Sequence, residues 1–269
     1  MAPARYAVFG QPIAHSLSPR IHAAFGAQFG MAIDYRAIEA GRGDFAAALD
    51  AFAHGGGLGA NVTLPLKEDA PLLCASSSER AQRCGSVNTL IRDGDRWHGD
   101  STDGIGLLRD LARQARDPRD ARVLLLGAGG AARAAAFALA EAGARELLIS
   151  NRTPARARSL ADSLGARAGT WEALAQESPF DLIVNATSAG HADAPLDLPR
   201  TLIASSTVCY DLSYGHAARS FLDWARANGA VRAVDGLGML VEQAAESFSL
   251  WHRRRPHTEP VHAMLRARP

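Results

Sequence analysis

A single lysine stands in a chain that otherwise carries its positive charge on arginine. The 269 residues include 29 lysines and arginines, and only Lys67 among them is a lysine. Arginine keeps its proton at any accessible pH, whereas lysine can give it up where its surroundings favour the neutral amine. Lys67 is therefore a candidate acid–base group, with chance survival of one lysine as the alternative.

Polar side chains surround Lys67 in the sequence and recur in nearby segments. Strand alternation in the run GANVTLPLK places Asn61 and Thr63 on one face, and Asn88 and Asp103 lie in SVNT and STDG. Such residues at strand ends line the crevice where open α/β sheets bind ligands. Asp103 is then a candidate partner for Lys67, or else an ordinary acid at the start of a helix.

Two serines precede a predicted helix near the N-terminus. Ser18 followed by Pro19 is typical of an N-cap and the first helical residue. The hydroxyls of Ser16 and Ser18, together with the free N–H groups of a helix start, would suit a carboxylate. A capping role alone is the alternative for Ser18.

A buried strand expected over 122–126 runs into a glycine-rich turn and an alanine-rich helix. Gly127, Gly129 and Ala132 fill the pattern G-x-G-x-x-G/A in the strand–turn–helix context of dinucleotide binding. Glycines let the backbone turn tightly beside a pyrophosphate, and the first N–H groups of the helix point toward it. The segment predicts a nucleotide site, with a tight turn that binds no ligand as the alternative.

Arginines follow the next strand, which is expected over 146–150. Asn151, Arg152 and Thr153 end this strand, and Arg156 and Arg158 lie just beyond. An NAD site carries an acid near this position, whereas arginine suits the 2′-phosphate of NADP. Guanidinium groups bind phosphate bidentately and stack on flat rings. The sequence therefore favours NADP over NAD, unless these are ordinary surface arginines.

Short apolar runs alternate with helical patterns along most of the chain. Further strands are expected over 6–9, 33–38, 59–62, 87–92, 182–185, 208–211 and 231–234, with helices over 19–29, 44–53 and 105–115 and a helical end over 238–268 broken near Pro256 and Pro260. This order predicts an α/β fold of mostly parallel sheets covered by helices. A polar, glycine-rich stretch over 92–103 suggests a first domain over 1–102, completed by 237–269, and a second over 103–236.

Composition excludes several classes of partner. A net charge of +1 gives no electrostatic reason to expect nucleic acid or an anionic membrane. Three cysteines without a C-x-x-C pattern argue against a disulfide framework or a zinc site, so no metal is expected. No signal-peptide pattern and no apolar run of membrane-spanning length is seen, which makes a reducing cytoplasm the expected location. His252, His257 and His262 recur across Pro256 and are expected at the surface.

Several motifs together resemble the shikimate dehydrogenase family. They are, in order along the chain, HSLSP-x-IH, NVTLPLKE, SVNTL, DSTDG-x-G, GAGGAAR, NRT, NATSAG and DGLGMLVEQA. The resemblance runs from Tyr6 to about Pro260. NVT-x-P-x-K together with STDG-x-G is far more specific than a glycine turn alone. The fold it implies is an N-terminal α/β substrate-binding domain, a Rossmann-type doubly wound NADP-binding domain, and C-terminal helices that return to the first domain.

The resemblance implies an oxidoreductase of chorismate and aromatic amino acid biosynthesis, which reduces 3-dehydroshikimate to shikimate reversibly with NADPH. Lys67 and Asp103 match the catalytic pair: Lys67 exchanges the proton of the reacting oxygen, and Asp103 orients it. Matching substrate positions are Ser16, Ser18 and Tyr214 at the carboxylate, and Asn61, Thr63, Asn88 and Gln243 at the ring hydroxyls. Matching cofactor positions are Gly127, Gly129, Gly130 and Ala131 at the pyrophosphate, Asn151, Arg152, Thr153 and Arg156 at the adenosine phosphate, and Thr187, Leu212, Gly236 and Met239 nearer the nicotinamide.

Two other functions remain open at this point. A quinate or dual quinate/shikimate dehydrogenase would differ in accepting one more ring hydroxyl; the serines at 16 and 18 lean toward shikimate, because some quinate-using relatives carry a bulkier threonine at the second position. A non-catalytic NADP-binding sensor would need the glycine turn and the arginines, but not Lys67 and Asp103 together. In each case the partner is a small molecule, and the chain is expected as a monomer or homodimer. Among departures from the family, Ser86 stands where alanine is common.

Overall fold

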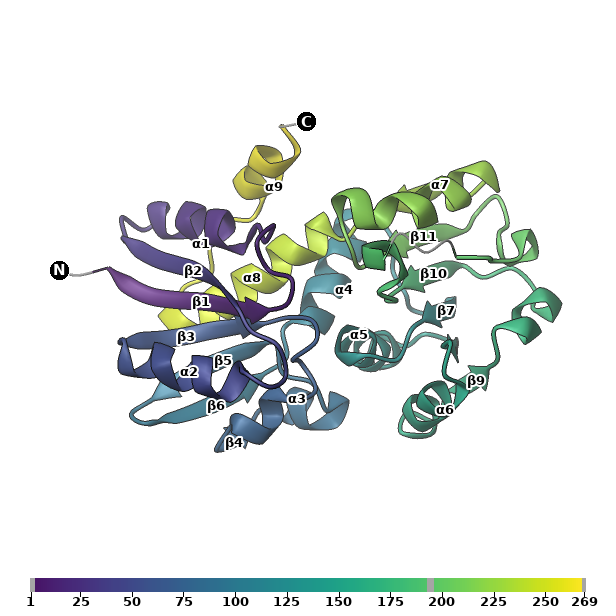
Figure 1. The fold of residues 1–269 in the computed structure, drawn as a ribbon. Helices are drawn as coiled ribbons and strands as arrows, with labels where there is room; N and C mark the ends of the chain where they lie inside the picture. The colour runs from purple at the N-terminus through teal and green to yellow at the C-terminus, as the bar shows by residue number, and fades with distance from the viewer. Residues whose placement is uncertain (1–2, 193–195, 268–269) are drawn as a thin grey trace. The chain divides into compact units, whose positions relative to one another are not determined.

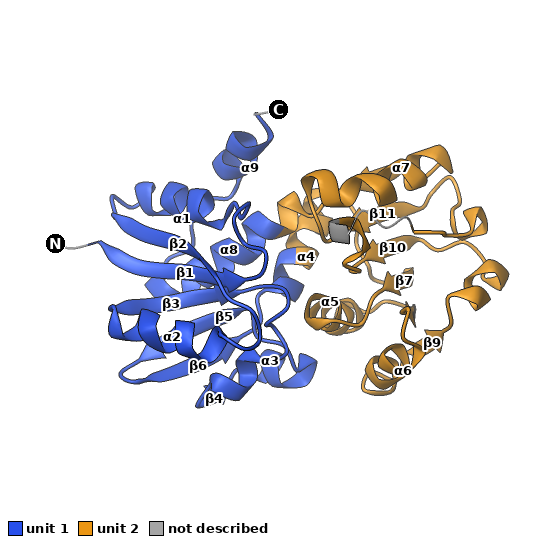
Figure 2. Cartoon of the chain, viewed as in Figure 1, with its two compact units in different colours: residues 1–106, 240–269 blue, residues 107–239 orange. Residues whose placement is uncertain are grey.

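Two compact units make up the chain (Figure 2). The structure is a computed structural model that describes residues 3–192 and 196–267. Unit 1 comprises Met1–Gly106 with Leu240–Pro269, and unit 2 comprises Leu107–Met239. The chain changes unit inside α4 (Asp103–Arg113) and inside α8 (Leu237–His252), a few residues beyond the boundaries expected at 102 and 236.

Unit 1 is built on a six-stranded mixed sheet with the order β2-β1-β3-β5-β6-β4. Its strands are β1 (Ala4–Gly10), β2 (Ile33–Glu39), β3 (Gly57–Val62), β4 (Ser76–Ser77), β5 (Thr89–Asp93) and β6 (Arg96–Asp100). β1 pairs in parallel with β2 and β3, whereas β5 runs antiparallel to both β3 and β6. The antiparallel hairpin brings the start of β5 to the edge of the sheet where β3 and β6 end.

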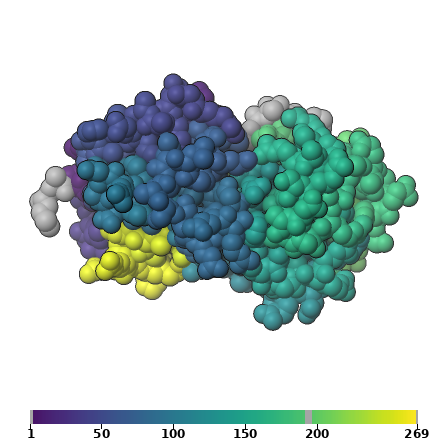
Figure 3. Space-filling model, turned by 90° about the horizontal axis from the view of Figure 1, so that it is seen from below, coloured from purple at the N-terminus to yellow at the C-terminus, as the bar shows by residue number. Residues whose placement is uncertain are grey.

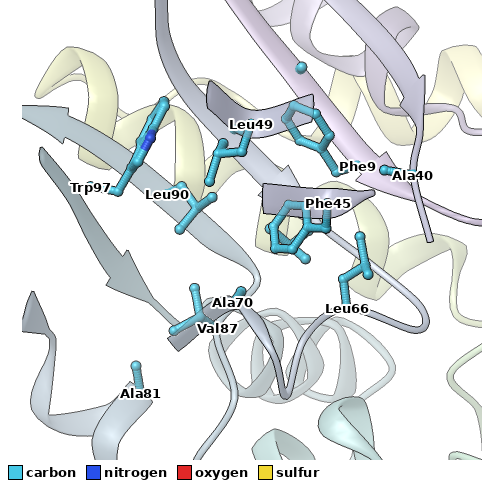
Figure 4. Packing of buried hydrophobic residues seen from close by; sticks show 13 residues of the cluster. Phe9, Ala40, Phe45, Leu49, Leu66, Ala70, Ala81, Val87, Leu90 and Trp97 are labelled. Atoms are coloured by element: carbon cyan, nitrogen blue, oxygen red, sulfur yellow. The ribbon is translucent and has the colours of Figure 1, made fainter. Parts of the chain in front are cut away.

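Alternation along β1 sends side chains to two separately covered faces of this sheet. Ala7 and Phe9 face a cluster completed by α2 (Phe45–His54) and α3 (Glu79–Cys84), part of which Figure 4 shows around Phe9, Phe45 and Leu90. Tyr6 and Val8 face the opposite side, where α1 (Ser18–Ala27) and α8 pack (Figure 1). The last helix, α9 (Glu259–Arg266), contacts α1. In Figure 3, the yellow C-terminal part of the described chain lies beside the purple and blue N-terminal part of unit 1.

Unit 2 is a fully parallel sheet with the order β12-β11-β10-β7-β8-β9. Its strands are β7 (Arg122–Leu126), β8 (Glu146–Ser150), β9 (Arg167–Gly169), β10 (Leu182–Asn185), β11 (Val208–Asp211) and β12 (Arg232–Val234), and its helices include α5 (Gly130–Glu141), α6 (Pro154–Asp162) and α7 (Arg219–Ala227). This is the strand order of a doubly wound dinucleotide-binding sheet, in which the direction of winding switches between β7 and β10. The Rossmann-type architecture expected for this half of the chain is confirmed.

Two local expectations are wrong. Ser18 does not cap α1, because the helix begins at Ser18 and Leu17 occupies the cap position without a side-chain bond. The polar stretch over 92–103, expected to lead to a domain boundary, holds β6, which pairs with β5. The C-terminal helical segment is broken as expected, since α8 ends at His252 and α9 begins at Glu259 with Pro260 in its first turn.

The C-terminal histidines differ in burial. His257 is exposed, as expected. The surface expectation is wrong for His262, which is buried with its Nε2 atom 3.0 Å from the Glu242 carboxylate. His252 is partly buried because its ring packs on Phe248, with 4.3 Å between ring centroids.

Candidate functional site

Lys67 and Asp103 form an ion pair in unit 1. The Nζ atom of Lys67 lies 2.6 Å from Oδ2 of Asp103, with 15% of the lysine side chain and 5% of the aspartate side chain exposed. Lys67 follows β3 in the chain, and its carbonyl accepts a bond from the Val87 backbone just before β5. Asp103 is the first residue of α4, where a carboxylate is favoured by the helix dipole. The pairing proposed from the two separate motifs is therefore present.

Asn88 holds the second oxygen of Asp103. Its Nδ2 group donates to Oδ1 of Asp103 at 3.0 Å and to the Thr102 hydroxyl at 2.9 Å. Its Oδ1 atom accepts the Thr102 backbone N–H at 2.7 Å, which fixes the orientation of the carboxamide. One carboxylate oxygen of Asp103 is bonded to Lys67 and the other to Asn88. These two contacts fix the orientation of the Asp103 side chain and, through it, the position of the Lys67 amine.

A row of polar residues crosses three strands beside this pair. Asn61 on β3 lies opposite Thr89 on β5, and Thr89 lies opposite Asp100 on β6. The Asn61 Nδ2 group donates to the Asn88 carbonyl at 3.1 Å, the Thr89 hydroxyl at 3.2 Å and the Ser247 hydroxyl at 2.9 Å. This network is buried, and satisfied polar networks of this kind rigidify the groups that they connect.

Helix α8 contributes two members of the same network. Gln243 and Ser247 are four residues apart and so share a helix face. The side-chain oxygen Oε1 of Gln243 accepts from the Asn88 carboxamide at 3.2 Å, and the Ser247 hydroxyl lies 2.8 Å from the Thr89 hydroxyl. The structure thus brings together Asn61, Asn88, Lys67, Asp103 and Gln243, all of which were predicted site residues.

The two predicted serines lie at the start of α1. The Ser18 backbone N–H donates to the Ser16 hydroxyl at 3.3 Å, and the Ser18 side chain is buried. Thr63 is partly exposed directly after β3, where its methyl group lies so close to Gly10 that a Cβ on that glycine would approach it to 2.4 Å. No direct bond joins Thr63 to the network among the described residues.

In unit 2 the glycine turn lies at the switch point of the sheet. Gly127 has φ +114°, and a Cβ there would lie 2.8 Å from the Ala186 carbonyl after β10, so only glycine fits. Gly129 precedes α5, whose first turn contains Gly130 and Ala131, both partly exposed. The first N–H groups of this helix have no partners within it, as an anion site at a helix N-terminus requires. The turn therefore fits a pyrophosphate.

The predicted adenosine-phosphate residues follow β8. Asn151 is partly exposed, and its side chain donates to the Thr153 carbonyl at 3.1 Å, which shapes the turn into α6. Arg152, Thr153 and Arg156 are exposed. Accessible guanidinium groups beside the glycine turn of a neighbouring strand fit the 2′-phosphate of NADP.

A second buried network links the ends of β10 and β11. Asn185 accepts from the Thr187 hydroxyl at 2.8 Å and donates to Asp211 at 2.7 Å. Asp211 in turn accepts the Ser213 backbone N–H at 2.7 Å. Burial raises the pKa of the Asp211 carboxyl to about 6, against the opposing effect of these hydrogen bonds. The network fixes the loops that carry Thr187 and Leu212, two of the predicted nicotinamide-side residues.

The other predicted residues of unit 2 lie after β11 and β12. A Cβ on Gly236 would lie 2.2 Å from the Leu212 carbonyl, and the Gly236 N–H donates to the Ser213 carbonyl at 2.8 Å. Met239 is buried in the first turn of α8. Tyr214 is partly exposed just before a short 3-10 turn.

Sequence reasoning missed several residues of the unit 1 network. Thr89 and Thr102 stand beside predicted site residues in the motifs SVNTL and DSTDG, and Ser247 follows Gln243 by four residues. That helical spacing was the available signal for Ser247. Tyr35 carried no local signal, because its bond to Asn61 depends on how β2 and β3 flank β1.

Three family models match successive parts of the chain. A shikimate dehydrogenase substrate binding domain matches residues 8–90, a shikimate / quinate 5-dehydrogenase model matches residues 110–194, and a shikimate 5'-dehydrogenase C-terminal domain matches residues 236–266. A shikimate dehydrogenase (NADP(+)) from Stenotrophomonas maltophilia is 56% identical over 268 residues, covering 97% of this chain and 95% of the relative. The chain belongs to the shikimate dehydrogenase family.

Solved structures agree with this membership. Shikimate 5-dehydrogenase from Thermus thermophilus, determined in complex with NADP(H) and shikimate, is 37% identical with a TM-score of 0.86, covering 98% of this chain and 99% of that one. The Ael1 enzyme from Pseudomonas putida is 42% identical with a TM-score of 0.89, covering 97% and 98%. Among the described residues, no helix is long and apolar enough to cross a membrane.

Proposed function

We propose that this member of the shikimate dehydrogenase family is an NADP-dependent oxidoreductase that reduces 3-dehydroshikimate reversibly to shikimate, a step toward chorismate and the aromatic amino acids. One observation carries the proposal: the Lys67–Asp103 pair, 2.6 Å apart, is locked by Asn88 into a network of hydroxyl and carboxamide groups. A cyclic substrate rich in hydroxyls matches that set of donors and acceptors.

The proposed catalytic step assigns proton transfer to Lys67. Reduction of a ketone leaves negative charge on its oxygen, and a positioned ammonium group can deliver a proton there. Asp103 keeps the Lys67 amine in place and accepts from the hydroxyl of the alcohol. When bound, NADPH supplies the hydride. In the oxidation of shikimate, the neutral amine of Lys67 takes the hydroxyl proton, and bound oxidised NADP would accept the hydride from the ring carbon.

The remaining residues are proposed to bind and orient the two ligands. Ser16 and Ser18 of unit 1, the substrate-binding domain, are assigned to the carboxylate, and Tyr214 is assigned to the same group. The ring hydroxyls are read by Asn61, Thr63, Asn88 and Gln243. In unit 2, the NADP-binding domain, the pyrophosphate is placed at Gly127, Gly129, Gly130 and Ala131, the adenosine phosphate at Asn151, Arg152, Thr153 and Arg156, and the nicotinamide near Thr187, Leu212, Gly236 and Met239.

The cellular setting belongs to the same proposal. Cys74, Cys84 and Cys209 are free thiols, which suits a reducing cytoplasm. The partner is a small molecule, and the chain is proposed to act as a monomer or homodimer.

Consumption of NADPH with 3-dehydroshikimate tests this function. We expect NADPH loss to match the formation of shikimate, identified by chromatography, one for one. A non-catalytic sensor would bind NADPH, as seen by fluorescence, without consuming it. That result, or a product other than shikimate, would refute the proposed reaction.

A quinate or dual quinate/shikimate dehydrogenase is the second candidate. It is favoured by the match of residues 110–194 to a family model whose description includes both shikimate and quinate dehydrogenases. Discrimination depends on whether the pocket accepts one additional ring hydroxyl. Initial rates with each substrate therefore separate the two functions.

A further inference from the structure

A buried tyrosine outside the predicted site donates a hydrogen bond to one of its substrate-binding groups. Tyr35 lies on β2, and its hydroxyl donates to Oδ1 of Asn61 at 2.8 Å. Because β1 lies between β2 and β3, the Tyr35 side chain reaches over β1 to contact Asn61.

The Tyr35 ring is fixed by its packing. It stacks on the His22 ring with 4.3 Å between centroids and 5° between planes, and the side chain belongs to the buried cluster of Tyr6, Val8 and Ile13. Burial lowers the pKa of His22 to about 3, so the stacked imidazole is neutral. Burial also raises the pKa of the Tyr35 hydroxyl well above 10, so it remains a donor at any working pH.

The partners of Asn61 leave its carboxamide one orientation. The Nδ2 group faces three acceptors, among them the Asn88 carbonyl and the Ser247 hydroxyl. Rotation by 180° would turn the carbonyl oxygen of Asn61 toward these groups and the amide toward the Tyr35 hydroxyl, losing the donor–acceptor match with the Asn88 carbonyl. Tyr35 is therefore the donor that satisfies the oxygen end of Asn61.

We propose that Tyr35 is a positioning residue for the substrate, holding the Asn61 carboxamide in the orientation that reads the ring hydroxyls. The role rests on the proposed function, which assigns Asn61 to those hydroxyls. The Tyr35 hydroxyl is the donor that fixes the oxygen end of this carboxamide. Without it, substrate binding must itself order the Asn61 side chain, which weakens binding more than it slows the chemical step.

Kinetics of Tyr35→Phe test the proposal, because this variant keeps the stacked ring and removes only the hydroxyl. We expect the KM for shikimate to rise by about tenfold, with kcat within about threefold and the KM for NADP unchanged. Tyr6→Phe is a matched control, because Tyr6 lies opposite Tyr35 in the β1–β2 register and is buried with its ring stacked on Trp251. It should leave all three constants unchanged. A lower Tm in Tyr35→Phe with an unaltered KM would show a merely structural role and overturn the proposal.

A second measurement uses the otherwise unchanged protein and does not depend on the folding of that variant. The chain has four tyrosines, so fluorinated tyrosine gives a fluorine NMR spectrum that can be assigned by removing Tyr6, Tyr210 and Tyr214 in turn. Shikimate should shift the Tyr35 signal and leave that of Tyr6 unchanged. An unmoved Tyr35 signal in a protein that oxidises shikimate overturns the Tyr35 role alone. A wild-type protein without that activity refutes the proposed function instead.

Discussion

Replacing Lys67 by arginine separates the charge of this residue from its exchangeable proton. Both side chains are cations that can pair with Asp103, but the guanidinium group does not release its proton at accessible pH. Removing the cation altogether would leave Asp103, 5% exposed, as an uncompensated carboxylate. Breaking a buried ion pair in that way costs about 3–5 kcal/mol of stability. Lys67→Arg avoids most of this loss.

The expected kinetic effect follows from the lost proton transfer. A positioned acid–base group contributes about 100-fold to 10,000-fold to the rate, so kcat should fall at least ~100-fold. This corresponds to about 2.7 kcal/mol of transition-state stabilisation. The KM values for shikimate and NADP should change little, because the charge and the contact to Asp103 are retained.

Steady-state NADP reduction, together with fluorescence titration of NADPH, measures both parts of this prediction. Arg42→Lys provides a control, since it also exchanges arginine and lysine at an ion pair. Arg42 pairs with Asp69 at an exposed position, and Asp69 is close to Lys67 in the chain. The control should keep full activity. A Lys67→Arg enzyme with a near-normal kcat would refute the assignment of proton transfer to Lys67, and loss of ligand binding in this variant would assign it a binding role instead.

Three further changes give separate predictions. Arg152→Asp should lower the ratio of kcat/KM for NADP to that for NAD by about tenfold or more, because a carboxylate repels the 2′-phosphate; an unchanged ratio contradicts this. Burial raises the pKa of Asp211 from 3.8 to about 6, so its proton stabilises the folded state fully below pH 3.8 and that stabilisation is lost as the pH rises to 6. The loss is about 3 kcal/mol, and Asp211→Asn should remove it from the pH dependence of the free energy of unfolding measured in urea; identical pH profiles would show that Asp211 titrates normally. Ser86→Ala should keep activity and maintain or raise the free energy of unfolding, by about 1 kcal/mol, because the described residues offer its buried hydroxyl no partner; a clear drop in Tm would show a missed bond.

Four strands of unit 2 were predictable because parallel strands buried on both faces read as continuous apolar runs, whereas the short edge strand β9 was missed. β7, β8, β10 and β11 have the bounds expected from the sequence. β6 was missed, since its sequence RWHGD alternates polar and apolar residues in an antiparallel hairpin rather than forming an apolar run. Short polar strands depend on their partners for definition, and local patterns do not show those partners.

The site was predictable to the extent that its residues sit in local motifs. Lys67, Asn88 and Asp103 could be named, and motif resemblance supplied their roles. The hydrogen bonds that orient them join residues far apart in the chain, as from Tyr35 to Asn61. The same holds for His262, whose burial against Glu242 arises from the packing of α9. Such contacts follow from tertiary packing rather than from spacing.

Initial rates of the wild-type protein show whether it oxidises shikimate with NADP. NADP reduction is followed by absorbance with shikimate, with quinate and without substrate, and the series is repeated with NAD. We expect rapid reduction of NADP by shikimate, much slower reduction with quinate or with NAD, and none without substrate. Failure to reduce NADP with shikimate, or faster turnover with quinate, would contradict the proposed function.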